Sequence, residues 1–89
     1  MPNTWIVYII KCSDNSLYTG ITIDLSRRIE EHTNNIGAKY TKGKAPFQII
    51  HTESFSNRSE ATKRELEVKK MKRIAKLELA TQSLNTQQT

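Results

Sequence analysis

The stretch that decides the fold is WIVYIIKCSDNSLYTGITI, residues 5–23. Residues 5–10 are β-branched, aromatic or otherwise apolar on both faces, which is typical of a buried strand. Residues 13–16 are Ser, Asp, Asn and Ser, a composition typical of a turn. Residues 17–23 favour β-structure again, so we expect the two runs to pair as an antiparallel hairpin.

A helix is expected directly after the hairpin, because Asp24 is a suitable N-cap. The residues that follow at steps of four and three place one stripe on the helix, formed by Leu25, Ile29 and His32. The helix should end near residues 34–35, with Gly37 closing it. Residues 36–45 alternate small and basic side chains, which indicates a loop with at most one helical turn.

The second half of the chain should contribute one strand and one long helix. Pro46 is tolerated at the start of a strand, and residues 47–52 favour β-structure. Asn57 and Glu60 resemble a capping box, and the helix-favouring stretch that follows runs to about Leu79.

This order of elements predicts the α+β class, with a small three-stranded antiparallel β-sheet flanked by helices. One domain should span residues 1–79. Residues 80–89 are mostly Thr, Gln, Ser and Asn, so we expect a flexible polar tail there.

The composition excludes two classes of protein. With 36% hydrophobic and 26% charged residues among 89, the chain is neither a low-hydrophobicity disordered chain nor a membrane protein. The longest apolar run is far shorter than a membrane span and lacks the flanks of a signal peptide. The single cysteine, Cys12, is expected to be a buried, inert thiol, in agreement with a cytoplasmic location.

The positive charge is concentrated in two segments. Residues 63–76 carry seven bases against two acids, which equals the whole surplus of +5. Lys39, Lys42 and Lys44 add a second basic segment without any acid. Together they could form one face for a polyanion, and the alternative is a solvated surface that keeps the protein soluble.

Two tyrosines and a glycine could share one face of the hairpin. If its loop has an odd number of residues, Tyr8, Tyr18 and Gly20 lie on the same side of the sheet; a two-residue loop would separate them. The alternative for the tyrosines is ordinary strand packing. Gly20 weakens a strand, so it indicates either close approach by a ligand or backbone, or a β-bulge.

Arg28 and His32 lie beside the apolar stripe of the first helix, whereas Arg27 should point to solvent. Arg28 is therefore the better candidate for binding a phosphate with its planar fork. The alternative readings are a rim arginine packed along its stem and a histidine packed at the edge of the stripe.

Glu65 occupies the apolar side of the long helix, four residues after Ala61 and three before Val68. A carboxylate there needs a counter-charge. Arg64 or Lys69 could provide an ion pair, and a divalent cation would serve equally well. Glu67 faces away from this stripe.

These residues resemble an ordered set of motifs from the GIY-YIG nuclease superfamily, in particular its short, stand-alone bacterial branch. The likeness covers about residues 5–79 and rests on Val7-Tyr8-Ile9, Tyr18-Thr19-Gly20, Arg28, Glu65 and Val68-Lys69. The first motif departs from the family name in having Val7 and Ile9, and the second in having Thr19, but both tyrosines and the second glycine are kept.

The resemblance implies a catalytic role for five residues. Tyr8 would be a general base, Tyr18 would orient water or phosphate, and Arg28 would stabilise charge on the phosphate. Glu65 would be the metal carboxylate, for Mg²⁺ or another divalent cation such as Mn²⁺. His32 matches a histidine often found on the same helix.

The implied activity is metal-dependent hydrolysis of DNA phosphodiester bonds, in a setting such as DNA repair. The expected partner is duplex, branched or single-stranded DNA, bound with weak sequence preference. We expect the protein to act as a monomer, with partner proteins in some steps. The residues expected to contact nucleic acid are Gly20, Lys39, Lys42, Lys44 and Lys69. The alternative is a non-catalytic nucleic-acid-binding module that requires a partner protein for cleavage.

Overall fold

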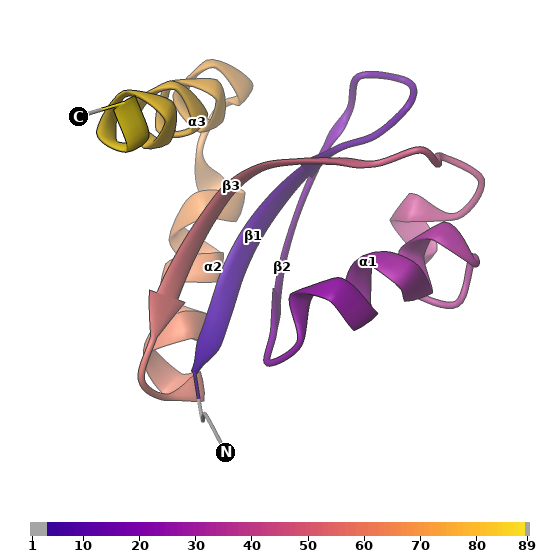
Figure 1. Cartoon of the computed structure of the whole chain (residues 1–89), viewed down its shortest axis with the longest axis horizontal. Coiled ribbons are helices and arrows are strands. Elements are labelled where there is room, and N and C mark those ends of the chain that lie inside the picture. The colour runs from indigo at the N-terminus through magenta and orange to yellow at the C-terminus, as the bar shows by residue number, and fades with distance from the viewer. Residues whose placement is uncertain (1–3, 89) are drawn as a thin grey trace.

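A computed structural model describes residues 4–88 of the chain. Its centre is a three-stranded antiparallel sheet in the order β2-β1-β3, as Figure 1 shows. The strands are β1 (Trp5–Lys11), β2 (Leu17–Thr22) and β3 (Gln48–Phe55). The predicted α+β fold with a small antiparallel sheet is therefore confirmed. β3 continues three residues beyond its predicted end, because it stays paired with β1 as far as Trp5↔Phe55.

The hairpin loop has an odd number of residues, which is the condition for Tyr8, Tyr18 and Gly20 to share a face. Five residues, 12–16, join the strands, and β1 pairs with β2 in the register Tyr8↔Gly20 and Ile10↔Tyr18. Asn15 takes the left-handed conformation at φ 69°, which Asn tolerates better than most residues. Tyr8, Tyr18 and Gly20 therefore lie on one face of the sheet.

Helix α1 (Leu25–Thr33) begins as predicted, with the Asp24 side chain accepting a hydrogen bond from the Arg27 amide. It ends at Thr33, close to the predicted 34–35, but the residue that closes it differs from the prediction. Asn35, at φ 62°, reverses the chain, and the amide of Ile36 donates to the Glu31 carbonyl at 2.9 Å. Asn35 thus closes the helix in place of the predicted Gly37, because a left-handed Asn can make the same capping turn.

The single long helix predicted to end near Leu79 is wrong: the segment forms α2 (Arg58–Lys70) and α3 (Arg73–Gln88). The chain is extended at Met71, with φ −70° and ψ 147°. A continuous helix would stack the bases at 69, 70, 72 and 73 at spacings of three and four, which is unfavourable for like charges. The break relieves this repulsion and turns α3 toward β3.

Helix α3 continues through Gln88, so residues 80–88, expected in a flexible polar tail, are helical here. Thr89 lies outside the described residues. The division into a domain at 1–79 and a tail at 80–89 stays a prediction. Within residues 4–88, no helix has the length and apolar character that crossing a membrane requires.

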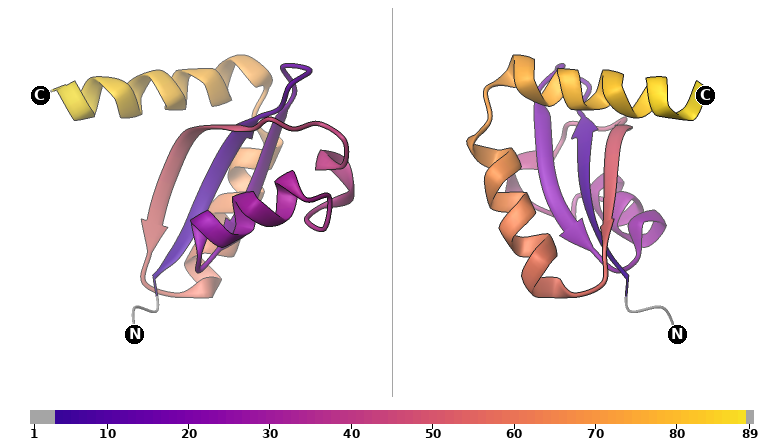
Figure 2. Two further views of the ribbon diagram at one scale, coloured as in Figure 1. Left: turned by 45° about the vertical axis from the view of Figure 1, so that its right-hand side comes forward. Right: turned by 90° about the vertical axis from the view of Figure 1, so that its left-hand side faces the viewer.

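The sheet is covered on both faces. Figure 2 shows α1 and α2 on opposite sides of it, with α3 across one end. Val7 and Ile9 of β1 are completely buried, as are Ala61 and Val68 of α2. Tyr8 points to the other face, where α1 lies. Since β2 is an edge strand, side chains from both helices can meet around that edge.

Candidate active site

The centre of the candidate site is a buried pair formed by Tyr8 and His32. The Tyr8 hydroxyl lies 2.9 Å from His32 Nε2, and the two residues are 1% and 0% exposed. Tyr18 packs against both rings, with centroids 6.3 Å from Tyr8 and 5.3 Å from His32. The structure thus places His32 in the interior of the site, well inside the edge position expected from the stripe.

A turn that follows α1 holds the other side of the His32 ring. This is the 3₁₀ helix η1 (Lys39–Thr41), whose Thr41 hydroxyl oxygen lies 2.8 Å from His32 Nδ1. Gly37 leaves the space that the ring fills, because a Cβ there would lie 2.5 Å from Nδ1. Sequence reasoning missed both contributions. The small and basic residues at 36–45 predict a loop with at most one helical turn, and η1 is that turn, but they do not predict contacts with His32.

Gly20 lies beneath the two tyrosines. A Cβ at this position would meet the Tyr8 hydroxyl oxygen at 2.5 Å and the Tyr18 ring at 3.1 Å. The glycine is therefore explained by close packing of the tyrosine rings on the backbone. Gly20 is buried, so it offers no exposed surface for the predicted contact with nucleic acid.

Arg28 brings a positive charge to this pair from α1. Its side chain is half-buried and donates to Glu31 at 3.0 Å, whereas the side chain of Arg27 is 77% exposed. Burial raises the pKa of Tyr8 to about 12, although the neighbouring Arg28 guanidinium acts in the opposite direction. Burial, and then the charge of Arg28, hold the pKa of His32 below its ordinary value.

Glu65 approaches from α2. Its side chain is only 16% exposed, and it forms an ion pair with Lys69 at 3.4 Å. Arg64, the other candidate counter-ion, instead binds Glu53 at 2.8 Å and Glu67 at 3.4 Å. Glu65 also acts electrostatically on Tyr8, where its charge raises the pKa.

The donor set near Glu65 is compatible with Mg²⁺. Within residues 4–88, no three His, Cys, Asp or Glu side chains gather as a dedicated metal cage. Mg²⁺ is commonly bound by one or two carboxylates together with substrate phosphates and water. A half-buried carboxylate with one lysine partner fits this kind of site, and Glu65 would hold the cation.

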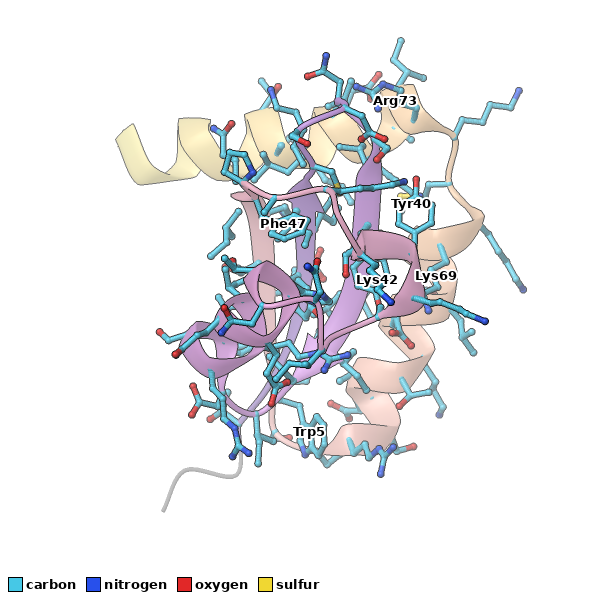
Figure 3. The ribbon with its side chains drawn as sticks, turned by 90° about the vertical axis from the view of Figure 1, so that its right-hand side faces the viewer. Trp5, Tyr40, Lys42, Phe47, Lys69 and Arg73 are labelled. Atoms are coloured by element: carbon cyan, nitrogen blue, oxygen red, sulfur yellow. The ribbon has the colours of Figure 1, made fainter. Side chains whose placement is uncertain are left out.

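The predicted basic contacts gather at the β2 edge, with one exception. Figure 3 shows Tyr40, Lys42 and Lys69 on the same side of β2. A cleft of about 230 Å³ lies there, lined by Leu17, Tyr18, Thr19, Tyr40, Lys69 and Lys76. Lys39, Lys42 and Lys69 are exposed. Lys44 is less available, because its ammonium lies 3.8 Å from the centre of the Tyr40 ring and 3.5 Å from Asp14.

A second hollow of about 360 Å³ continues from Arg28 toward the start of β1, where Trp5 lies (Figure 3). Its lining includes Arg27, Arg28 and Ile21. The site therefore sits between two hollows along the β2 edge, an arrangement that an extended, charged polymer could follow.

The family assignment follows from this geometry together with comparison to known proteins. Residues 4–78 match the model of the GIY-YIG catalytic domain, and the chain belongs to this family of nuclease domains. A UPF0213 protein of Haloquadratum walsbyi is 49% identical over 82 residues, which is 92% of each chain. A UPF0213 protein of Clostridium perfringens is 51% identical over 73 residues, covering 82% of this chain and 78% of the relative.

Two solution structures share the fold. The UPF0213 protein of Bacillus halodurans is 44% identical with a TM-score of 0.57, over 88% of this chain and 83% of that one. A protein of E. faecalis is 42% identical with a TM-score of 0.61, over 97% of this chain and 90% of that one. The resemblance inferred from the motifs is confirmed at the level of the family.

Proposed function

We propose that this chain is an endonuclease that hydrolyses DNA phosphodiester bonds with the help of a divalent cation. The observation that carries the proposal is the convergence of a phenol pair, a half-buried arginine and a half-buried carboxylate around the β2 edge. These groups come from β1, β2, α1 and α2 of a single chain. The proposed site needs no second copy, so we propose that a monomer is active.

Arg28 is proposed to bind the scissile phosphate. Its planar guanidinium matches two phosphate oxygens and keeps its charge at any working pH. The contact with Glu31 fixes one nitrogen, Nη1, at 3.0 Å and so restricts the rotamers of the side chain. A fixed positive charge in a partly dry site stabilises the charge that develops in the transition state.

Tyr8 and His32 are proposed to remove the proton of the attacking water. With a pKa of about 12 for Tyr8, roughly one phenol in 10⁵ is ionised near pH 7. A resting phenolate is therefore a poor description of the base. Instead, the Tyr8 oxygen receives the proton of the water while its own proton passes to His32 Nε2, 2.9 Å away.

Atoms and charges balance in this step. A bond forms between the water oxygen and phosphorus, and one bridging P–O bond breaks. His32 ends as an imidazolium, and the leaving oxygen takes a proton from solvent. When bound by Glu65, Mg²⁺ or Mn²⁺ would supply Lewis-acid stabilisation of charge on the phosphate. Tyr18, whose ring lies beside both Tyr8 and His32, would position the water.

The DNA backbone is proposed to contact Lys39, Lys42 and Lys69, the exposed members of the basic group. Contacts to phosphates fix the position of the duplex or strand without reading its sequence, so weak sequence preference is expected. The more phosphates the protein contacts, the more steeply its affinity for DNA falls with added salt. A role in processing damaged or branched DNA would suit such an enzyme.

The adjacent arginines provide the experiment. Purified protein should nick a supercoiled plasmid with Mg²⁺ and stop when EDTA is added. Arg28→Ala should lower the rate roughly 10²- to 10³-fold, as loss of a transition-state stabiliser does. Arg27→Ala removes the same charge from an exposed position and should change the rate less than about threefold.

Equal rates for the two variants would contradict the proposal. Metal-independent DNA binding by all three proteins without any cutting would instead favour a binding module that acts through a partner.

A further inference from the structure

The two nitrogens of the His32 ring are each engaged by one buried hydroxyl group. Nε2 lies 2.9 Å from the Tyr8 hydroxyl, and Nδ1 lies 2.8 Å from the Thr41 hydroxyl. The Thr41 hydroxyl in turn lies 2.9 Å from the carbonyl oxygen of Ala38. Four groups therefore form one line of hydrogen bonds, running from β1 through α1 to η1.

Counting protons along this line fixes their direction. A backbone carbonyl can only accept, so the single proton of the Thr41 hydroxyl is donated to Ala38. The Thr41 oxygen must then accept from His32, which requires a proton on Nδ1. A neutral imidazole carries one proton, so Nε2 has none and accepts from Tyr8. Every donor and acceptor in the line is satisfied only in this direction.

We propose that Thr41 is a positioning residue that holds His32 in the Nδ1–H tautomer and so leaves Nε2 free to receive the proton of Tyr8. In the opposite tautomer, Thr41 would have to donate to Nδ1. The Thr41 hydroxyl oxygen and the Ala38 carbonyl oxygen would then face each other at 2.9 Å without a proton between them. The tautomer itself is a property of the fold; its catalytic consequence rests on the proposed nuclease function.

Burial and close packing hold the His32 ring in these two hydrogen bonds. Thr41 and His32 are 1% and 0% exposed, so solvent cannot replace either hydrogen bond. The backbone at Gly37 is packed so closely on the ring that even a Cβ would lie 2.5 Å from Nδ1. The ring edge that meets Thr41 is thus set by the backbone of residues 37–41 as well as by the hydroxyl.

The position of Thr41 explains why the basic turn lies where it does. Thr41 is flanked by Tyr40, which stacks on Tyr18, and by the exposed Lys42. One short turn therefore presents lysines at the surface and sets the proton on a buried histidine beneath. A residue that contacts only DNA would not need a hydroxyl pointing inward at this place.

Nitrogen NMR of protein labelled at histidine tests the proposal directly. In the wild-type protein at about pH 8, where His32 is neutral, Nδ1 should give the signal of a protonated nitrogen and Nε2 that of an unprotonated one. The His32→Gln variant separates this signal from that of His51. A wild-type protein with the proton on Nε2 would overturn the proposal whatever the variants do.

Two substitutions at one position separate the hydroxyl from the shape of the side chain. Thr41→Ser keeps the hydroxyl and should preserve the tautomer and at least about a third of the cleavage rate. Thr41→Val keeps the shape, should move the proton to Nε2, and should lower kcat roughly 10²- to 10⁴-fold, the size associated with a catalytic histidine in the wrong tautomer. The KM for DNA should change less than about threefold in both.

The outcomes distinguish this proposal from the nuclease function. If Thr41→Val shifts the proton while even wild-type protein fails to cut DNA, the tautomer assignment holds and the nuclease function fails. If Thr41→Val keeps the proton on Nδ1, or cuts DNA at the rate of Thr41→Ser, the positioning role is contradicted. Should Thr41→Val not fold, the wild-type spectrum and Thr41→Ser still decide.

Discussion

At the scale of single residues, two glycines provide the space that the site requires. Gly20 accommodates the Tyr8 ring and Gly37 accommodates the His32 ring. At either position, a Cβ atom would lie 2.5 Å from the nearest atom of that side chain. Gly43 offers a contrast, since a Cβ there would meet nothing within 4 Å, although its φ of 74° disfavours other residues. Close packing therefore accounts for the glycines at 20 and 37, and backbone conformation accounts for the glycine at 43.

Replacing Gly20 by Ala should displace the Tyr8 hydroxyl from His32, because the hydroxyl occupies the place of the new methyl group. We expect a loss of about 1–3 kcal/mol in stability from overpacking and a fall in cleavage rate of at least about tenfold. Gly43→Ala should cost about 1 kcal/mol through its backbone conformation and leave the cleavage rate unchanged. Thermal unfolding and single-turnover cleavage measure both. A Gly20→Ala enzyme as fast as Gly43→Ala would contradict this account.

At the same scale, sequence reasoning predicted part of the site. A face shared by Tyr8 and Tyr18 was predicted only for a turn with an odd number of residues, and the structure has such a turn. The partnership of Tyr8 with His32 joins residues 24 positions apart, and that of His32 with Thr41 depends on the path of a loop. No pattern of hydrophobic residues specifies such contacts, because they form only when α1 packs on the sheet.

At the scale of elements, one ion-pair group attaches α2 to the sheet. Arg64 donates to both carboxylate oxygens of Glu53 on β3, at 2.8 Å and 3.1 Å, and His51 lies 2.7 Å from the same carboxylate. Burial raises the pKa of Glu53, but the hydrogen bonds from Arg64 and His51 outweigh it and hold the pKa below its ordinary value. This face of the sheet is opposite to the one that carries Tyr8.

Removing Arg64 should make the protein less stable and less sensitive to acid. Arg64→Met leaves a partly buried carboxylate without its main partner, at a cost of about 2 kcal/mol after allowance for its partial exposure. Because the folded pKa of Glu53 is lowered, its contribution is present above the unfolded value of 4.5 and is lost as pH falls below it. Over the same fall in pH, Arg64→Met should therefore lose less stability than the wild-type protein.

The control is Glu67→Gln, which removes the other, 66% exposed partner of Arg64 and should cost less than about 0.5 kcal/mol. Urea unfolding of the three proteins between pH 7 and pH 3.5 is the measurement. A variant at Arg64 that matches Glu67→Gln in stability would show that this group does not hold α2.

The elements themselves were largely predictable, apart from one boundary. Strands and helix caps follow from local composition, as Asp24 and Asn57 illustrate with their side-chain caps. The break between α2 and α3 carries neither glycine nor proline. It follows from charge crowding and from the docking of Arg73 on the hairpin, where it donates to the Asn15 carbonyl at 2.7 Å. That contact spans 58 positions and is invisible in a local pattern.

At the scale of the whole molecule, the candidate site exists because β2 is an edge strand. Helices α1 and α2 cover opposite faces (Figure 2), yet a charged side chain from each, Arg28 and Glu65, acts electrostatically on Tyr8. Arg28 and Glu65 are therefore brought near Tyr8 by topology, although they are 37 positions apart in the sequence. The basic turn η1 lies over the same edge (Figure 3), where a polyanion would meet both.

The measurement that tests this account most directly compares two carboxylates of one helix. Glu65 is 16% exposed and faces the site, whereas Glu67 is 66% exposed and pairs with Arg64. Single-turnover cleavage of end-labelled DNA should be slowed roughly 10²-fold or more by Glu65→Gln, with little effect on DNA binding in the absence of metal. Glu67→Gln should cut at the wild-type rate. Equal rates for the two variants would contradict a nuclease site at the β2 edge.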